Sequence, residues 1–326
     1  MLKPARNHDP HFNTMVDVKI LSTTNSRYLA EKIADYYGQP LGDLTVKRFS
    51  DGEMQPVINE SVRGGFVFFI TSTYQPHENL MELLLAIDAA KRASAGYITA
   101  VMPYFGYARQ DRKDKPRVPI SAKLIANLLQ AAGADRIMTM DLHADQIQGF
   151  FDIPVDHLKS EAIYLPYLQE NLDLSNVTFA SPDVGGVKRA RTFAKHFNRP
   201  LVICDKYRKR ANEIAGMTVI GDVTDADVVL VDDLVDTAGT LCQASDILKE
   251  KGANKVVAYA THAVLSGASI DNITNSTLDE VVITTVSRRD SEVALLLEQK
   301  GAIEMIENIS AQELARKGVG DAQGAL

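Results

Sequence analysis

Short apolar runs of four or five residues recur along the chain and alternate with segments of helical periodicity. The runs are rich in β-branched and aromatic residues and do not alternate with polar positions, which is typical of strands covered on both faces of a sheet. The pattern predicts strands at residues 66–70, 98–102, 137–140, 177–180, 201–204, 228–231 and 256–260.

Helices are predicted between these runs. Apolar residues spaced at i, i+3, i+4 and i+7 form one stripe in each of two segments. They are Leu80, Leu83, Leu84 and Ile87, and then Leu241, Ala244, Ile247 and Leu248. A third helix is expected to have Ser26 as its N-cap and to end at Gly38. Because strands alternate with helices, the predicted fold class is α/β, with mainly parallel sheets flanked by helices.

The chain also contains a weak internal repeat. One strand ends in Met140-Asp141-Leu142-His143 in the first half, and another ends in Val231-Asp232-Asp233-Leu234 in the second. Another strand and turn precede each of these segments, which suggests two similarly built units. We therefore expect an N-terminal extension at residues 1–16, one domain at residues 17–157 and a second domain at residues 158–326.

Composition and charge exclude several classes of protein. The net charge of −7, from 35 Lys and Arg against 42 Asp and Glu, argues against a nucleic-acid partner. A run of about 18 apolar residues is absent and the start of the chain is polar, so we expect neither a membrane span nor a signal peptide. Cys204 and Cys242 lie in apolar or helical patterns. We expect both to be free thiols, as in a cytoplasmic protein.

Positive charge is concentrated in two segments of this acidic chain. Residues 109–117 hold five Lys and Arg side chains, and residues 206–210 hold four. Such segments are often only solvated surface, but two compact ones in an acidic protein favour small anionic ligands.

The most informative segment for chemistry is residues 228–240. An apolar strand leads to Asp232 and Asp233, and Asp236 then begins a turn of small residues that opens a helix. The carboxyl ends of strands are where ligands bind in open α/β sheets, and a helix N-terminus with free N–H groups and hydroxyls can hold a phosphate. The alternative is that Asp-Thr-Ala-Gly is only a helix-capping turn. The phosphate-binding sequence G-x-x-x-x-G-K-[ST] is absent, and the glycine-rich string at residues 318–324 has the wrong spacing for a dinucleotide site.

Several strings together resemble ribose-phosphate diphosphokinase (PRPP synthetase), class I. They lie at residues 48–53, 103–113, 141–144, 146–152, 181–183 and 232–240, in the order and spacing of that family. The resemblance covers residues 17 to 286. It implies two tandem phosphoribosyltransferase-type domains and transfer of the β,γ-diphosphoryl group of ATP to O1 of ribose 5-phosphate, with Mg²⁺ as cofactor. The products are PRPP and AMP, and self-association, commonly into hexamers, is implied as well.

The resemblance also implies a role for individual residues. The residues implied to bind ATP are Asp51, Gly52, Glu53, Arg109 and Gln110. The residues implied to bind ribose 5-phosphate are Arg208, Asp232, Asp236, Thr237, Ala238, Gly239 and Thr240. Lys206 and Arg208 match the catalytic loop, and His143 and Asp183 match the Mg²⁺ positions. Because Mg²⁺ prefers oxygen ligands, an imidazole is an unusual ligand, and His143 contacting the ion through water is an alternative.

The chain departs from the family in two places. The catalytic loop has Tyr207 and Lys209 where the family has arginine and proline, while Lys206 and Arg208 are kept. The stretch from residue 287 to 326 does not match the family's ending, so we do not predict control by ADP or phosphate. Two alternatives stay open. One is a nucleotide-salvage phosphoribosyltransferase, and the other is a catalytically silent homologue that regulates an active enzyme.

Overall fold

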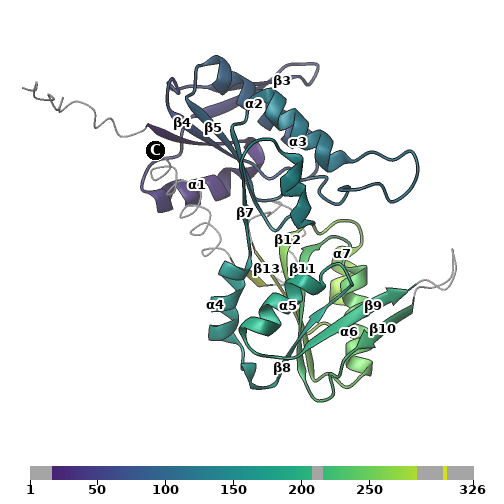
Figure 1. The fold of residues 1–326 in the computed structure, drawn as a ribbon. Coiled ribbons are helices and arrows are strands. Elements are labelled where there is room, and N and C mark those ends of the chain that lie inside the picture. Colours follow the sequence, from purple (N-terminus) through teal and green to yellow (C-terminus); the bar gives the residue numbers. More distant parts are fainter. Residues whose placement is uncertain (1–16, 208–215, 285–303, 307–326) are drawn as a thin grey trace, which may run out of the picture.

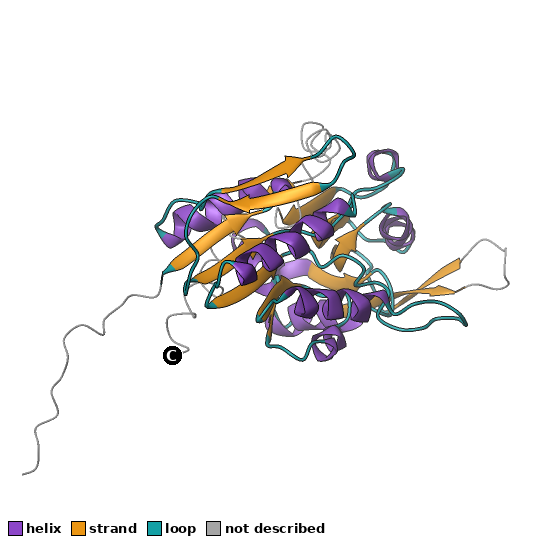
Figure 2. Ribbon diagram, turned by 90° about the horizontal axis from the view of Figure 1, so that it is seen from above, coloured by secondary structure: helices purple, strands orange, loops and turns teal. Residues whose placement is uncertain are grey.

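The computed structural model describes residues 17–207, 216–284 and 304–306 (Figure 1). The predictions for Arg208, for the extension at residues 1–16 and for the string at residues 318–324 lie outside the described residues. Two sheets dominate the described part, and helices flank the strands on both sides (Figure 2).

The first sheet contains five parallel strands in the order β1-β4-β5-β6-β7. Their bounds are β1 Val18–Ser22, β4 Phe66–Ile70, β5 Tyr97–Met102, β6 Arg136–Met140 and β7 Val155–Leu158. The helices are α1 Arg27–Tyr37, α2 Glu78–Arg92 and α3 Ser121–Ala132. Phe68 and Ile70 pack in one hydrophobic cluster with α1, whereas Val67 and Phe69 pack with α2 and α3. Both faces of the sheet are therefore covered, which explains the unbroken apolar runs.

A separate antiparallel hairpin follows α1. Its strands are β2 Leu44–Arg48 and β3 Met54–Ile58, and Arg48 pairs with Met54 beside the turn. β3 lies against α2 (Figure 1).

Among the described residues, the second sheet contains seven strands in the order β10-β9-β8-β11-β12-β13-β14, and only the β9–β10 pair is antiparallel. The strands are β8 Val177–Ser181, β9 Leu201–Tyr207, β10 Gly216–Ile220, β11 Asp227–Val235, β12 Lys255–Ala263, β13 Glu280–Thr284 and β14 Glu304–Ile306. The helices are α4 Glu161–Asn171, α5 Val187–His196, α6 Gly239–Glu250 and α7 Ser269–Thr274. Helices α4 and α5 pack on one face, and α6 and α7 pack on the other. The part of the chain that the structure describes also contains three short 3-10 helices: η1 Thr24–Ser26, η2 Asp145–Phe150 and η3 Leu174–Asn176.

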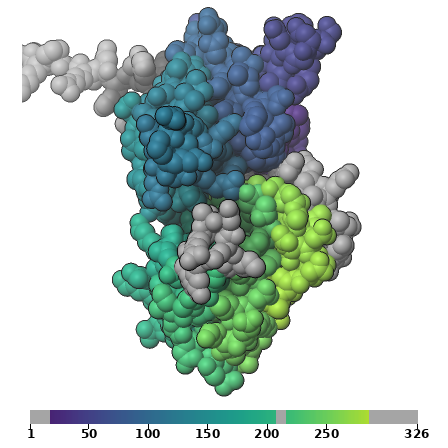
Figure 3. All heavy atoms as spheres, turned by 90° about the vertical axis from the view of Figure 1, so that its right-hand side faces the viewer, coloured from purple at the N-terminus to yellow at the C-terminus, as the bar shows by residue number. Residues whose placement is uncertain are grey.

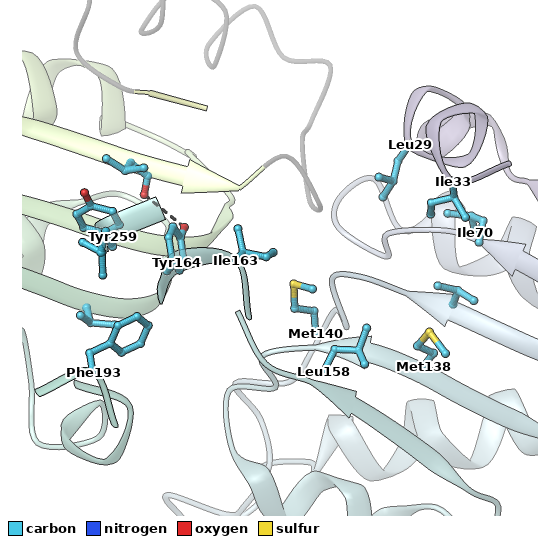
Figure 4. Packing of buried hydrophobic residues seen from close by; sticks show 14 of the residues in the cluster. Leu29, Ile33, Ile70, Met138, Met140, Leu158, Ile163, Tyr164, Phe193 and Tyr259 are labelled. Atoms are coloured by element: carbon cyan, nitrogen blue, oxygen red, sulfur yellow. Dashed lines mark hydrogen bonds between the residues drawn. The ribbon is translucent and has the colours of Figure 1, made fainter. Parts of the chain in front are cut away.

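One hydrophobic cluster extends through both halves of the molecule. Figure 4 follows it from Leu29 and Ile33 in α1, past Met140 and Leu158, to Tyr164 of α4. Tyr164 is 1% exposed, and its hydroxyl donates to the backbone oxygen of Ala260 in β12 at 2.6 Å. Burial of large apolar and aromatic side chains is the main stabilising contribution of such a cluster. The two halves, which are stacked in Figure 3, therefore pack directly on each other.

The prediction of seven buried strands is confirmed, since each predicted run lies within an observed strand. The bounds of the first helix are also confirmed, because α1 starts after Ser26 and ends at Gly38, whose φ of 88° is the left-handed conformation that glycine adopts easily. Ser26 is the N-cap residue, as predicted, but its side chain forms no capping hydrogen bond. Its Oγ accepts a hydrogen bond from Ser72 N at 2.9 Å and thereby ties α1 to the end of β4.

The boundary between the two domains stays a prediction. The first sheet ends with β7 at Leu158, and α4, the next helix, packs on the second sheet. Both observations are compatible with a boundary near residue 157.

Candidate active site

The second sheet changes winding direction beside β8. From β8 the chain continues to β9 on one side, whereas β11 lies on the other side of β8. In parallel sheets the crevice outside such a point, at the carboxyl ends of the strands, is the usual ligand site. Asp183 follows β8 there, and Asp236 follows β11.

The loop after β11 has the geometry of an anion site. It covers Asp236, Thr237 and Ala238, and α6 begins at Gly239. Ala238 has a φ of 63°, an uncommon conformation for alanine, and it is buried while Thr237 and Gly239 are exposed. The first N–H groups of α6 have no partner within the helix and lie at its positive end. We call residues 236–240, which are predicted to bind the sugar phosphate, the sugar-phosphate loop.

The two carboxylates at the end of β11 differ in their surroundings. Asp233 is 6% exposed; it accepts a hydrogen bond from His143 Nδ1 at 2.8 Å, and Arg189 lies at 3.5 Å. Burial raises the pKa of Asp233, but the hydrogen bond from His143 and the charge of Arg189 outweigh it and hold that pKa below its ordinary value. Burial and the charge of Asp233 raise the pKa of Asp232 well above its ordinary value.

An ion pair links the two halves of the molecule at this site. Arg109, from the loop after β5, donates to Asp236 Oδ2 at 2.6 Å. The pair lies in a cavity of about 270 Å³ whose lining includes residues of both halves. They include Thr73, Tyr104, Arg109, Gln110, Asp236 and Ser266. Two residues predicted for the nucleotide therefore share a cavity with one predicted for the sugar phosphate.

The hairpin tip is not part of this cavity. Asp51, Gly52 and Glu53 are exposed between β2 and β3, where Glu53 N donates to Asp51 Oδ1 at 3.1 Å. Within the described part of the chain, no hydrogen bond or ion pair joins them to Arg109 or Gln110. Their assignment to ATP stays a prediction.

The two predicted metal positions lie on neighbouring loops. His143 follows β6 and uses Nδ1 for Asp233, so a bond to a ligand would come from Nε2. Asp183 is exposed, and its Oδ1 accepts a hydrogen bond from Gly186 N at 2.8 Å. Among residues 17–207, 216–284 and 304–306, three or more His, Cys, Asp or Glu side chains do not form a cluster that could hold an ion. A second cavity of about 430 Å³ touches His143 and Gly185, near both positions.

Lys206 lies near the end of β9, opposite Met217 of β10, and is exposed. It does not line either cavity in the described structure. Its predicted partner in catalysis, Arg208, lies outside the described residues.

Sequence reasoning missed two buried charges at the site. Arg189 of α5 has a side chain that is only 16% exposed, and it faces the carboxylates of Asp141 and Asp233. Asp141 is 4% exposed, has a φ of 40° and accepts hydrogen bonds from Ser160 and Thr261. The charge pattern did not distinguish Arg189 from its exposed neighbours Lys188 and Arg191, because only packing decides which of them is buried.

Comparison with known proteins identifies the family. Residues 18–133 match the family model described as the N-terminal domain of ribose phosphate pyrophosphokinase, and residues 205–305 match the phosphoribosyl synthetase-associated domain. The ribose-phosphate pyrophosphokinase of Porphyromonas gingivalis is 58% identical over 272 residues, which cover 83% of this chain and 87% of that protein. The chain belongs to the ribose-phosphate pyrophosphokinase family.

Two further comparisons place the chain in the same family. The ribose-phosphate pyrophosphokinase of Campylobacter jejuni is 55% identical over 267 residues, covering 82% of this chain and 86% of that protein. The crystal structure of phosphoribosylpyrophosphate synthetase from Mycobacterium smegmatis superposes with a TM-score of 0.85 at 35% identity, and the match covers 95% of this chain and 100% of that one. The predicted family and the predicted fold of this chain are therefore confirmed. In the described part, each helix is too short or too polar to cross a membrane.

Proposed function

We propose that the chain transfers the β,γ-diphosphoryl group of ATP to O1 of ribose 5-phosphate, forming PRPP and AMP. The observation that carries this proposal is the Arg109–Asp236 contact of 2.6 Å in one cavity. It joins a residue matched to the family's nucleotide site with one matched to its sugar-phosphate site. Transfer between two bound substrates requires that their sites adjoin in this way.

The sugar-phosphate loop is suited to ribose 5-phosphate. Backbone N–H groups and the hydroxyls of Thr237 and Thr240 lie at the N-terminus of α6, where a phosphate is stabilised. Asp232 and Asp236 have carboxyl groups that can form hydrogen bonds with sugar hydroxyls. On the other side, Arg109 and Gln110 supply a cation and an amide for the nucleotide, and a guanidinium can also stack on an aromatic base.

The residues present also fit Mg²⁺ bound together with a nucleotide. Mg²⁺ usually takes one or two carboxylates and completes its shell with water and substrate phosphates, so a dense protein cluster is not required. Asp183 is exposed in the crevice, and its second carboxylate oxygen can face such an ion. His143 would contribute through Nε2, directly or through water, because Asp233 orients its ring through Nδ1. When bound, the ion would draw charge from the phosphates.

Catalysis would then depend on positioning and charge. Phosphoryl-type transfer needs little covalent chemistry from the protein, so the enzyme must align the sugar oxygen with the β-phosphorus and stabilise developing negative charge. Lys206 and Arg208 are the residues that we predict to stabilise the developing negative charge. Asp236 and the first turn of α6 align the sugar oxygen by holding the sugar phosphate.

We also propose that the protein self-associates. Helices α2 and α3, which contact each other, carry exposed apolar side chains at helical spacing. These are Met81 and Leu85 on α2, and Leu124 and Leu128 on α3. Contiguous exposed apolar surface often marks a protein interface. The cytoplasm is the compartment that we propose, since both cysteines are buried free thiols.

The reaction is tested by incubating the purified protein with ribose 5-phosphate, ATP and Mg²⁺ and following AMP and PRPP by ³¹P NMR. We expect both products in equal amounts. Asp236→Asn should slow the reaction, whereas Asp246→Asn, an exposed change on α6 that contacts Thr277, should not. Product only after PRPP and a base are supplied would indicate the salvage alternative. An inactive protein that alters the rate of an active relative would indicate a regulatory homologue.

A further inference from the structure

The segment after β12 forms hydrogen bonds with the backbone at the end of β11 and in the sugar-phosphate loop. The N–H groups of Val264 and Leu265 both donate to the backbone oxygen of Val235, at 3.0 and 2.9 Å. Ser266 N donates to the backbone oxygen of Asp236 at 3.1 Å. Asn272 of α7 donates from Nδ2 to the backbone oxygen of Thr237 at 2.8 Å. The carbonyl groups of three successive residues, 235 to 237, are therefore held by one neighbouring segment.

This supporting segment has an unusual backbone. Leu265 has a φ of 47° although it is a bulky residue, and it is 2% exposed. A non-glycine residue in this conformation costs about 1–2 kcal/mol and persists where the surroundings fix it. Gly267, with a φ of 57°, lies against Thr237, since a Cβ at Gly267 would be 3.7 Å from Thr237 Cγ2. Ser266 thus lies between two residues with positive φ.

The side chain of Ser266 completes the contact. Its hydroxyl donates to Asp236 Oδ1, while Arg109 donates to Oδ2 of the same carboxylate at 2.6 Å. Ser266 also lines the cavity of about 270 Å³ that Arg109 and Gln110 line. Both oxygens of Asp236 are therefore held, one by the segment after β12 and one by the first half of the molecule.

We propose that Ser266 is a positioning residue, whose hydroxyl holds the Asp236 carboxylate in the orientation that binds ribose 5-phosphate and faces Arg109. This inference rests on the proposed function, because it assigns Asp236 to the sugar phosphate. Without the Ser266 hydroxyl, Asp236 would be held only at Oδ2 by Arg109, whose long side chain is 53% exposed, and the carboxylate could then turn about its χ2 torsion. The hydroxyl thereby makes the affinity for the sugar phosphate depend on the segment after β12.

The test compares three variants with the wild type. Ser266→Ala removes the hydroxyl, Ser266→Thr keeps it, and Ser276→Ala is the matched control. Ser276 Oγ donates to Ile273 O at 2.8 Å and accepts from Leu278 N at 3.3 Å, and it does not line the cavity. Because hydrogen bonds to charged groups are the stronger ones, Ser266→Ala should raise the KM for ribose 5-phosphate about tenfold. The KM for ATP should change by less than about twofold, Ser266→Thr should restore most of the affinity, and Ser276→Ala should behave as wild type.

Calorimetric titration with ribose 5-phosphate alone separates this inference from the proposed reaction. Wild type that binds ribose 5-phosphate but releases no AMP with ATP would refute the reaction, and the variants would still test Ser266 by their dissociation constants. An unchanged affinity of Ser266→Ala for ribose 5-phosphate would overturn the inference, as would an equal rise of both KM values. If Ser266→Ala does not fold, Ser266→Cys is tested in the same way, because a thiol keeps the volume of the side chain but is a weak donor. A lower affinity for ribose 5-phosphate would support the inference, and an unchanged affinity would overturn it.

Discussion

Replacing Arg189 with methionine tests whether one buried cation holds the centre of the site together. Its guanidinium lies 3.5 Å from Asp233 Oδ1, and its side chain is 16% exposed. Burial lowers the pKa of Arg189, but the nearby carboxylates, chiefly Asp141 and Asp233, outweigh burial and raise it above its ordinary value. Arg189→Met keeps the length of the side chain and leaves these carboxylates without their buried cation.

The expected loss of stability is large. Removing one partner of a buried ion pair costs about 3–5 kcal/mol, because the remaining charge is left without compensation in a poorly hydrated place. For a domain of roughly 150–250 residues, each kcal/mol corresponds to about 2–4 °C in melting temperature. We therefore expect Arg189→Met to melt about 10 °C below wild type. Arg189→Lys keeps the positive charge, so its melting temperature should fall by less than that of Arg189→Met.

Thermal unfolding followed by circular dichroism at pH 7 measures the effect, and Arg191→Met is the matched control. Arg191 lies on the same helix, α5, but is exposed, so its replacement should change the free energy of unfolding by less than about 0.5 kcal/mol. Equal melting temperatures of Arg189→Met and Arg191→Met would show that Arg189 does not compensate the buried carboxylates. A larger loss in Arg189→Lys than in Arg189→Met would also contradict the reasoning.

Three further predictions follow from single features. Lys206→Ala should lower kcat by about 10²–10³-fold with little change in the KM for ATP. A change in the KM for ATP as large as the change in kcat would refute a role confined to the transition state. Burial lowers the pKa of His157 to about 4, so the folded protein binds this proton only at a lower pH than the unfolded chain does. The free energy of unfolding should therefore fall as the pH drops from about 6.5 to 4. His157→Asn should show a weaker pH dependence of the melting temperature over that range, and an unchanged dependence would contradict this assignment. Leu124→Glu, which puts a charge on the exposed face of α3, should lower the mass measured by analytical ultracentrifugation, and an unchanged mass would argue against this face as the interface.

The sequence by itself determined most of the strands that are buried on both sides, although β1 and β13, which are also largely buried, were not predicted. Residues 66–70 and 228–231 are read correctly as strands because helices cover both faces of the sheets, so each run is continuously apolar. Strands with exposed or polar positions carry no such signal. The hairpin strands β2 and β3 and the edge strand β10 were missed for that reason.

One part of the candidate site could be predicted from local sequence, and another part could not. The loop from Asp236 to Thr240 could be predicted, because an apolar strand, an acidic pair and small residues before a helix are adjacent in the sequence. Its link to Arg109 could not be derived from local pattern, since 127 positions separate the two residues and only the packing of the halves brings them together.

Which charges become buried was decided only by the tertiary structure. Lys188, Arg189 and Arg191 are similar in sequence, yet α5 turns Arg189 alone of the three toward Asp141 and Asp233. Likewise, nothing in the residues around Ser266 indicates that its hydroxyl meets Asp236. Local sequence determines strands, helices and turns because it sets periodicity and backbone preference. The partners of each polar group depend on contacts between distant segments, and these form only when both sheets and their helices pack together.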